Sequence, residues 1–479
     1  MLQTTQRTSI LLCTLSCLLG CSRTAISLEG RANKDGVRTV PSSKDAGVDD
    51  WDAATASDAG NMSIPGVDAG MLSEAFRLTV YDNGDVVPGV EVIFHEPDGD
   101  FRHYQRTNQR GTIERIVKPG SLVTVFFRPE NTNAEREFTA ITYSGIQPGE
   151  HIHVGSRVEE KNEERYPIRL ELNNLPRDIG GLFLSIGCEQ DLPEIDSRVV
   201  EFELEEKCLD SQGRVSFLLS TAPSRRGQQL FSFQENISIS EDRDTVVRFN
   251  NWERGGSEGV EIQLDDSPQN TSWYYYEAGP VSNDRKYRSV IRQAEGPRVQ
   301  LNVPFGISQE LFFRAAFVVG FEEISAYSIY TSPPRSMREY RLSAAEDFLN
   351  LITSVDVRRS ARSGRPVMTW VEETVSSLKP DGRLAQMRVL SEGGRSLRWL
   401  AVIDPKYDGQ FDFPEMPPQM DEFEWIDDGR IDIWQLISLK SEIFGGYETF
   451  KRDFGPRALD PEARGLAETQ FSLGGSLEF

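Results

Sequence analysis

The segment Phe76-Arg77-Leu78-Thr79-Val80 alternates apolar and polar residues and begins the part of the chain that reads as folded. After the turn residues Asp82-Asn83-Gly84, the stretch Pro88-Gly89-Val90-Glu91-Val92-Ile93-Phe94 alternates again. Successive side chains of a strand point to opposite faces, so this alternation predicts strands with one buried face. Such strands, split by Asn-Gly, Asp-Gly and Pro-Gly pairs, are typical of antiparallel sandwiches. We therefore predict an all-β fold of tandem Ig-like antiparallel β-sandwiches.

A diffuse repeat extends this pattern toward the C-terminus. Three alternating segments each open a unit, and they are Ile168–Leu172, Val260–Leu264 and Ser354–Val357. A similar strand follows later in each unit, at Gly213–Phe217, Pro297–Leu301 and Gly409–Phe413. The openings are separated by roughly 90 residues, which suits one sandwich per unit and is too long for a solenoid repeat. We predict separate domains of similar topology joined end to end.

The predicted domains follow from these units. They are a signal peptide at 1–20, a disordered acidic tether at 21–75, sandwiches at 76–157, 158–252 and 253–345, and a β-rich C-terminal domain at 346–479. The tether holds three Asp-Ala-Gly triplets and few large apolar residues, so it cannot bury enough surface to offset the entropy cost of ordering.

Two segments have sequence features that are typical of helices. Ser343-Ala344-Ala345-Glu346 has the form of a capping box and predicts a short connecting helix. In the C-terminal domain, Ile433, Leu436, Ile437 and Lys440 fall at helical spacing, and this segment stays open between helix and strand.

The first sandwich resembles the bacterial Ig-like and carboxypeptidase-regulatory-like (transthyretin-like) domains. The resemblance lies in Val80 and Asp82 before the first turn, Pro88 before the second strand, and Thr107-Asn108-Gln109-Arg110-Gly111. It implies the sandwich fold over 76–157. Such modules are mostly spacers and binding units, so the resemblance says little about function.

Upstream, Ser9–Cys21 is an apolar run that follows Arg7 and predicts a secretory signal peptide, because it is too short to span a bilayer. Its end, Leu18-Leu19-Gly20-Cys21, resembles the lipobox of bacterial lipoproteins. The resemblance implies that Cys21 is acylated and that the chain is cut just before it. Cys17 is a second candidate, and an ordinary signal peptide is the alternative. By the same resemblance, Ser22 implies outer-membrane sorting, facing the periplasm or the surface.

The formal net charge of −23 limits the classes of partner that this protein can bind. Such a surface repels nucleic acid and anionic headgroups, so we expect no nucleic-acid partner. We expect membrane attachment to come from the lipid alone.

Two cysteines remain beyond the signal peptide, Cys188 and Cys208. An even pair in an exported chain predicts a disulfide, here between the ends of neighbouring strands. The alternative, a structural zinc, lacks the four ligands that it needs.

Histidine is the scarcest catalytic residue type, and all four lie in the first sandwich: His95, His103, His151 and His153. His151 and His153 share one strand face and could hold a metal with His95 or a carboxylate, but we favour a solvated face. No histidine follows residue 153, which excludes Ser-His-Asp and Cys-His sites from the later units. We predict no catalytic, cofactor or metal site.

The aromatic run Trp273-Tyr274-Tyr275-Tyr276 is the candidate ligand site. On a strand, one pair faces the core, and an exposed second pair would stack on sugar rings or a partner protein. The alternative is that both faces are covered. We expect a lipid-anchored cell-envelope protein with a structural or binding role, such as adhesion to carbohydrate or protein. The alternative function is a secreted polysaccharide hydrolase with carboxylates in the C-terminal domain.

Overall fold

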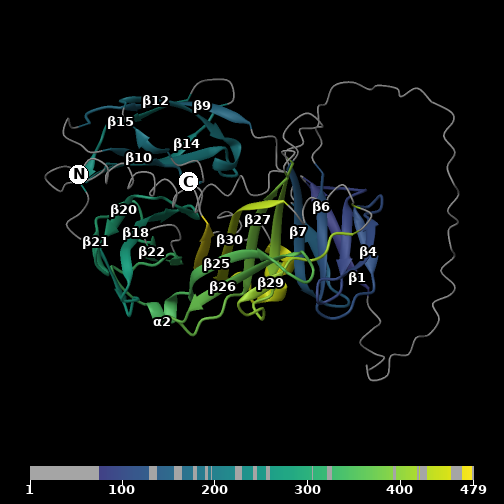
Figure 1. Ribbon diagram of the computed structural model, residues 1–479. Coiled ribbons are helices and arrows are strands. Elements are labelled where there is room, and N and C mark those ends of the chain that lie inside the picture. The colour runs from purple at the N-terminus through teal and green to yellow at the C-terminus, as the bar shows by residue number, and fades with distance from the viewer. Residues whose placement is uncertain are drawn as a thin grey trace, which may run out of the picture.

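The fold was taken from a computed structural model. It describes residues 75–476 except 83, 129–136, 156–163, 176–180, 189–191, 196, 222–228, 241–244, 255–258, 305, 321–325, 392–394, 418–419, 421–428 and 455–466. These residues form an all-β protein, as predicted, built from antiparallel sandwiches (Figure 1). Cys21 and the predicted tether lie outside the described residues.

The first unit is a sandwich of two sheets. Its strands are β1 (Phe76–Asp82), β2 (Asp85–Val86), β3 (Glu91–His95), β4 (Phe101–Arg106), β5 (Thr112–Arg115), β6 (Ser121–Phe127), β7 (Glu137–Ile146) and β8 (His151–Val154). In one sheet β1 pairs antiparallel with β5 and parallel with β8. The other sheet has the order β4-β3-β6-β7.

The second and third units repeat this topology. The second contains β9 (Arg165–Leu172), β10 (Leu182–Ser185), β11 (Leu192–Ile195), β12 (Val199–Glu205), the 3-10 turn η2 (Glu206–Cys208), β13 (Arg214–Thr221), β14 (Leu230–Ser238), β15 (Thr245–Phe249) and β16 (Glu253–Arg254). The third contains β17 (Val260–Asp265), β18 (Thr271–Ser282), β19 (Arg285–Lys286), β20 (Val290–Ala294), β21 (Arg298–Leu301), β22 (Leu311–Val319), β23 (Ala326–Thr331), β24 (Glu339–Ser343) and helix α2 (Ala344–Asp347).

In all three units the first strand lies between an antiparallel partner and a later strand that runs parallel to it. The orders are β5-β1-β8, β12-β9-β15 and β21-β17-β24. The second and third units share no sheet. The predicted likeness of topology therefore holds for these two, and it extends to the first unit.

The fourth unit has a different strand order. It contains β25 (Leu351–Arg359), β26 (Pro366–Glu373), β27 (Gly382–Leu390), β28 (Ser396–Ile403), β29 (Gln410–Asp412), β30 (Arg430–Ser441), helix α4 (Tyr447–Thr449), the π turn η4 (Phe450–Phe454) and β31 (Thr469–Ser476). A short sheet, β25-β26-β29, faces the row β28-β27-β30-β31. The prediction that this unit shares the topology of the second and third is wrong.

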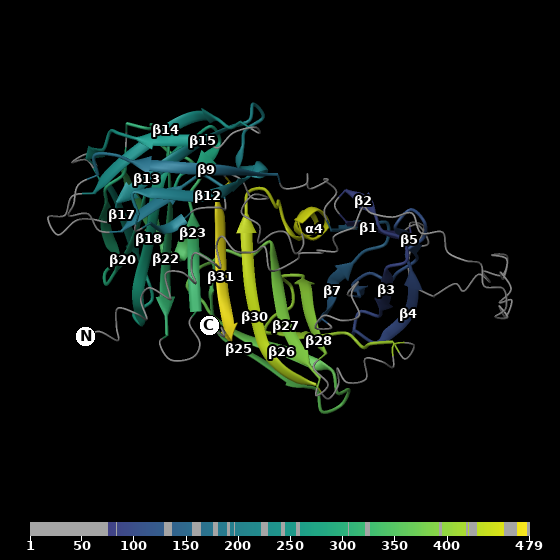
Figure 2. The same cartoon turned by 90° about the horizontal axis from the view of Figure 1, so that it is seen from above.

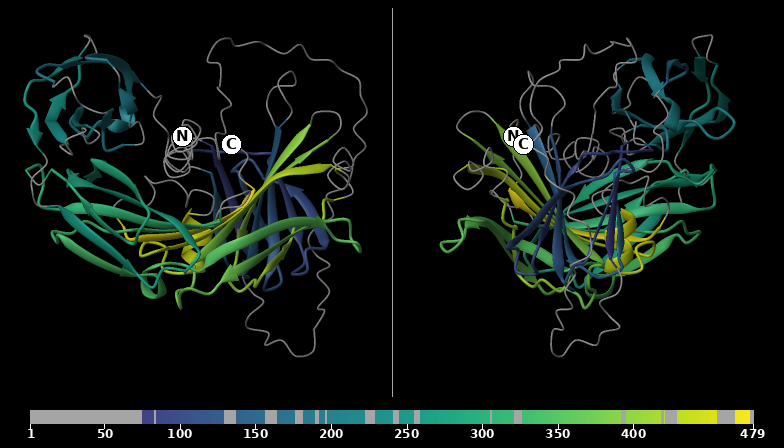
Figure 3. Two further views of the ribbon diagram at one scale, coloured as in Figure 1. Left: turned by 60° about the vertical axis from the view of Figure 1, so that its left-hand side comes forward. Right: turned by 90° about the vertical axis from the view of Figure 1, so that its right-hand side faces the viewer.

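One sheet runs through three of the four units. It has 13 strands in the order β19-β18-β22-β23-β31-β30-β27-β28-β7-β6-β3-β4, with β20 paired to β18. The fourth unit joins the third through β31, antiparallel to β23, and joins the first through β28, parallel to β7. The predicted end-to-end row is therefore wrong for these units, because the chain folds back and its last unit lies between the first and the third. Figures 2 and 3 show the sheet as one curved surface, with the second unit standing above it.

Both faces of this sheet are buried along its inner strands. Along β27, Leu384 belongs to one hydrophobic core, while Ala385 and Met387 belong to another on the opposite face. The second of these cores crosses the junction between units, because it includes Ile93 of the first unit and Trp399 of the fourth. This burial on two faces resolves the ambiguity at 430–441. Leu436 and Ile437 of β30 pack in different cores, so their spacing reflects a strand covered on both sides.

The predicted connecting helix is present as α2. The Ser343 side chain accepts a hydrogen bond from the amide of Ala345, and the Ser343 amide donates to Asp347 at 2.8 Å. The carboxylate that accepts the hydrogen bond from the Ser343 amide is therefore that of Asp347, and not that of Glu346 as the capping-box pattern predicts. Within the described residues, no helix has the length and apolar character needed to cross a membrane.

Candidate functional site

The junction between the first and fourth units gathers an extended buried polar network within the described part of the chain. Its backbone is the parallel pair β7–β28, in which Ala140 lies opposite Trp399 and Thr142 lies opposite Ala401. A separate sandwich would leave each of these strands as a sheet edge with unpaired amides and carbonyls. The pairing satisfies both edges and places polar side chains on either side of them.

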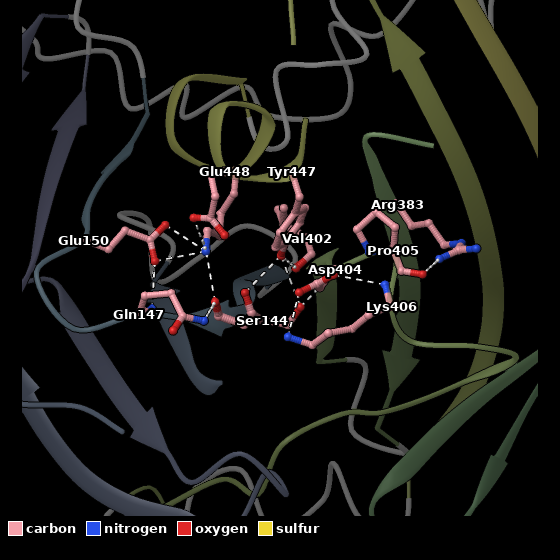
Figure 4. A network of polar contacts seen from close by, with 12 residues as sticks. Ser144, Gln147, Glu150, Arg383, Val402, Asp404, Pro405, Lys406, Tyr447 and Glu448 are labelled. Atoms are coloured by element: carbon pink, nitrogen blue, oxygen red, sulfur yellow. Dashed lines mark hydrogen bonds and ion pairs between the residues drawn. The ribbon is translucent and has the colours of Figure 1, made fainter. Parts of the chain in front are cut away.

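Lys451 is the centre of the network on one face, and Figure 4 labels its partners Glu150, Glu448 and Tyr447. Its side chain is 0% exposed, and its Nζ lies 2.8 Å from Glu150 Oε1 and 3.2 Å from Glu448 Oε2. It also donates to the carbonyl of Gly145 at 3.1 Å and lies over the Tyr447 ring. Burial raises the pKa of Glu150, although Lys451 opposes that shift. A buried ion pair of this kind fixes the position of η4 against the β7–β8 turn.

Tyr447 connects the two junction strands directly. Its hydroxyl lies 3.0 Å from the carbonyl of Ser144 in β7 and 3.1 Å from the carbonyl of Val402 in β28. The Ser144 hydroxyl accepts a hydrogen bond from the backbone amide of Asp404, with 2.9 Å between the two atoms. These contacts hold the ends of β7 and β28 together (Figure 4).

A second polar chain crosses the same junction on the opposite face. His95 Nε2 lies 3.0 Å from Thr124 Oγ1, which lies 2.8 Å from Thr142 Oγ1. The indole of Trp399 donates to Thr142 Oγ1 at 2.9 Å. Burial lowers the pKa of His95 to about 3, with Arg365 contributing, so this imidazole is neutral at physiological pH. The chain joins β3, β6, β7 and β28 side by side.

A buried ion cluster lies in the third unit. Glu277 in β18 contacts Arg288 and Arg314, each at 3.0 Å, and accepts a hydrogen bond from the Tyr275 hydroxyl at 3.1 Å. Burial alone would raise the pKa of Glu277, but the two arginines and Tyr275 outweigh it and lower that pKa. All its acceptors are engaged within the fold, which makes this cluster structural.

The predicted disulfide between Cys188 and Cys208 is present, with 5.5 Å between the α-carbons. It does not join neighbouring strands as expected. Cys188 follows β10 and Cys208 ends η2 after β12, and these strands belong to different sheets of the second unit. The bond therefore ties the two sheets together.

The segment at the disulfide also contacts the third unit through hydrogen bonds from Arg285. Arg285 donates to the carbonyls of Cys208 at 2.5 Å and Leu209 at 3.0 Å. Beside it, the rings of Phe233 and Tyr287 meet edge to face with 5.5 Å between centroids. These contacts seat the second unit on the β18–β20 region of the third.

The candidate ligand site at Trp273–Tyr276 is not exposed. Tyr274 and Tyr276 pack in the core of the third unit, and Tyr275 lies in the core on the other face of the sheet. Trp273 is half-buried and meets Tyr327 edge to face. The alternative that both faces are covered is confirmed, and the exposed aromatic pair is not present, because β18 is an inner strand of the long sheet.

The histidines do not assemble a metal site among the residues that the structure describes. His151 and His153 do share a face, with 4.0 Å between ring centroids, and His151 Nε2 lies 3.0 Å from Thr79 Oγ1. No group of three or more His, Cys, Asp or Glu side chains within the described part of the chain could hold a metal.

Sequence reasoning did not find Lys451 or Tyr447. Lys451 is about 300 positions from Glu150 in the chain, and neither lies in a recognisable motif. The only signal was Phe444, Tyr447 and Phe450 at helical spacing, a pattern equally typical of an ordinary surface helix.

No protein-family model and no curated protein matches this chain. Among solved structures it is similar to the Bacillus anthracis TIE protein, at 11% identity over 58% of this chain with a TM-score of 0.13. It spans 50% of that protein's length. A tetra-tandem repeat in the extending region of a large adhesion protein is 8% identical, covers 84% of this chain and 99% of its own, and has a TM-score of 0.13. A streptococcal ancillary pilin is 10% identical over 63% of this chain and 95% of its own, with a TM-score of 0.12. At such values these likenesses do not bear on function.

Proposed function

We propose that this is a lipid-anchored cell-envelope protein, sorted to the outer membrane, that serves as a rigid non-enzymatic scaffold with a structural or binding role. The continuous sheet of 13 strands is the observation that carries the proposal. Tandem modules on flexible connections move relative to one another unless their interfaces are large and apolar. Here the first and fourth units share a core, a strand pair and buried polar contacts on both faces.

The distribution of polar groups supports a mechanical role over a catalytic one. The buried ionisable side chains Lys451, Glu150 and Glu277 are engaged with oppositely charged neighbours. Their contacts join strands and units together. A scaffold of this kind would hold a surface in a fixed orientation above the membrane while the predicted tether sets its distance.

The anchor is tested with Cys21→Ser in the native host, and Cys17→Ser serves as the matched control. We expect the Cys21→Ser protein to leave the detergent phase in phase separation, while Cys17→Ser partitions like the wild type. Unchanged partitioning of Cys21→Ser would contradict lipid anchoring at this residue.

The scaffold role is tested in cells that lack the protein. We expect loss of the protein to change envelope strength or attachment, and the wild-type chain to restore it. Cys21→Ser should not restore it even when it accumulates to the wild-type level. Full restoration by the unanchored chain would contradict an envelope-anchored role.

A further inference from the structure

The edge of the first unit at β4 and β5 carries a cluster of basic side chains. Strand β4 ends one sheet of this sandwich and β5 ends the other. His103 of β4 lies opposite Phe94 in register, with 6.5 Å between their rings. The Arg115 guanidinium of β5 lies over the same Phe94 ring, with its Cζ 5.8 Å from the centroid. His103 and Arg115 therefore flank Phe94 where the two sheets part.

Several arginines of the structure pair with a carboxylate, whereas Arg115 does not. Arg128 contacts the carboxylate of Glu91, Arg314 that of Glu277, and Arg388 that of Asp432. Arg115 forms no ion pair with any residue that the structure describes, and its Nε is buried without a hydrogen-bond acceptor. A buried donor without an acceptor costs free energy. This is unexpected in a chain with 75 acidic residues.

Neighbouring cations increase that cost. Burial lowers the pKa of His103, and Arg115 and Arg102 lower it further. The pKa of Arg115 is lowered by burial and then by Arg102. The carboxylate of Glu96 contacts Arg102 at 3.5 Å and Lys118 at 2.9 Å. The cluster thus holds more positive than negative charge, and the Nε donor of Arg115 has no acceptor among the described residues.

We propose that Arg115 and His103 form a binding site for a single phosphate group. A phosphate presents acceptor oxygens that match the planar donors of a guanidinium, and its charge favours the protonated imidazole. The net charge of −23 opposes long polyanions, so the site suits one phosphate on a small molecule or headgroup. The biological meaning rests on the binding role proposed above, while the test below does not involve the lipid anchor.

The test follows His103 by NMR during titration with inorganic phosphate at constant ionic strength, using the full chain with Cys21→Ser. Only four histidines contribute ring signals. We expect saturable binding that raises the pKa of His103. Arg115→Gln should weaken phosphate affinity by roughly tenfold or more, because it removes a charged donor. Arg115→Lys keeps the positive charge but lacks the planar pair of guanidinium donors. Its loss of phosphate affinity should therefore be smaller than that of Arg115→Gln.

Arg298→Gln is the matched control, because it removes one positive charge from an exposed arginine of the third unit. Its phosphate affinity should equal that of the wild type. Equal weakening in Arg298→Gln and Arg115→Gln, or a His103 signal that phosphate does not move, would overturn the proposal. Far-ultraviolet circular dichroism of each variant separates lost binding from lost fold.

Two further binding experiments ask whether the phosphate group belongs to a sugar or to a lipid headgroup. Glucose 6-phosphate represents a phosphorylated sugar, and phosphatidylcholine vesicles with phosphatidic acid represent a lipid headgroup. Binding of either one that depends on Arg115 supports the site and identifies its source. Binding of both that is indifferent to Arg115→Gln contradicts it. Failure here leaves the lipid anchor and the scaffold untouched, because those are tested by partitioning and by complementation.

Discussion

At the scale of single residues, the buried ion pair of Lys451 and Glu150 is the most sensitive point of the junction. We expect Lys451→Met to lower the free energy of unfolding by about 3–5 kcal/mol at neutral pH, because it leaves a buried carboxylate without its cation. Without Lys451 the pKa of Glu150 rises further, so the folded state prefers the neutral acid. The loss should therefore be small below about pH 4 and should grow as pH rises.

Urea unfolding of Lys451→Met at pH 4 and pH 7.5 measures this difference. The double variant Lys451→Met/Glu150→Gln is the control, since it removes both charges and should recover much of the stability at pH 7.5. A loss that is independent of pH would show that packing, and not charge, accounts for the effect.

Glu277→Gln should show the same direction of pH dependence, although the pKa of Glu277 is lowered in the folded state and that of Glu150 is raised. Because the pKa of Glu277 is lowered, its stabilising contribution is present above the ordinary carboxyl range and disappears as pH falls through the folded value. Glu277→Gln should cost about 3–5 kcal/mol near pH 7, because it removes the buried carboxylate that two partly buried arginines share. The exposed pair Arg169–Glu201 provides the comparison, and Glu201→Gln should change stability by less than about 1 kcal/mol.

Chemical denaturation of both glutamine variants from pH 3 to pH 7 tests this expectation. The Glu277→Gln and wild-type curves should approach each other toward acid pH. Parallel curves over the whole range would contradict the assignment of Glu277 as the charged partner.

At the scale of elements, β31 closes the long sheet between the third and fourth units. Its Gly474 has no room for a side chain, because an added Cβ would lie 2.5 Å from the carbonyl oxygen of Ile352. Gly474→Ala should lower the free energy of unfolding by about 1–3 kcal/mol through overpacking. Gly296→Ala is the control, since nothing lies within 4 Å of its added Cβ. Thermal unfolding of both variants measures the difference, and equal melting temperatures would contradict the packing described for β31.

The disulfide belongs to the same scale, because it ties two sheets and supports the loop that receives Arg285. Replacing Cys188 and Cys208 by serine should lower the stability of the second unit by about 3 kcal/mol, given their sequence separation of 20. Thermal unfolding with and without reductant checks this result. A wild-type protein that reductant does not affect would show that the bond does not stabilise the unit.

Strands, turns and the disulfide could be predicted because each is encoded within one short segment. Alternation at Phe76–Val80 and the Ser343 cap are local signals, and the structure contains both elements. The burial of Tyr274–Tyr276 could not be predicted, because a strand with two covered faces differs from an exposed one only through its neighbours in space. The contacts of Lys451 are likewise set by residues about 300 positions away.

At the scale of the whole molecule, the fold-back of the fourth unit onto the first predicts how the protein unfolds. The first, third and fourth units share one sheet, whereas the second unit contributes no strand to it. We expect one large cooperative transition for the three joined units and a separate transition for the second. Scanning calorimetry of the wild type and of Lys451→Met tests this, and the variant should shift only the large transition. Four independent transitions would contradict a single joined body.

The pairing of β7 with β28 is the central claim, and native-state hydrogen exchange tests it most directly. If the two strands pair, the amides of 139–143 and 397–402 should exchange as slowly as those of the inner strands β6 and β27. Strand β12, which has a partner on one side only, provides the reference for an edge. If every second amide along β28 exchanges as fast as the outward amides of β12, then the first and last units are separate and the account is wrong.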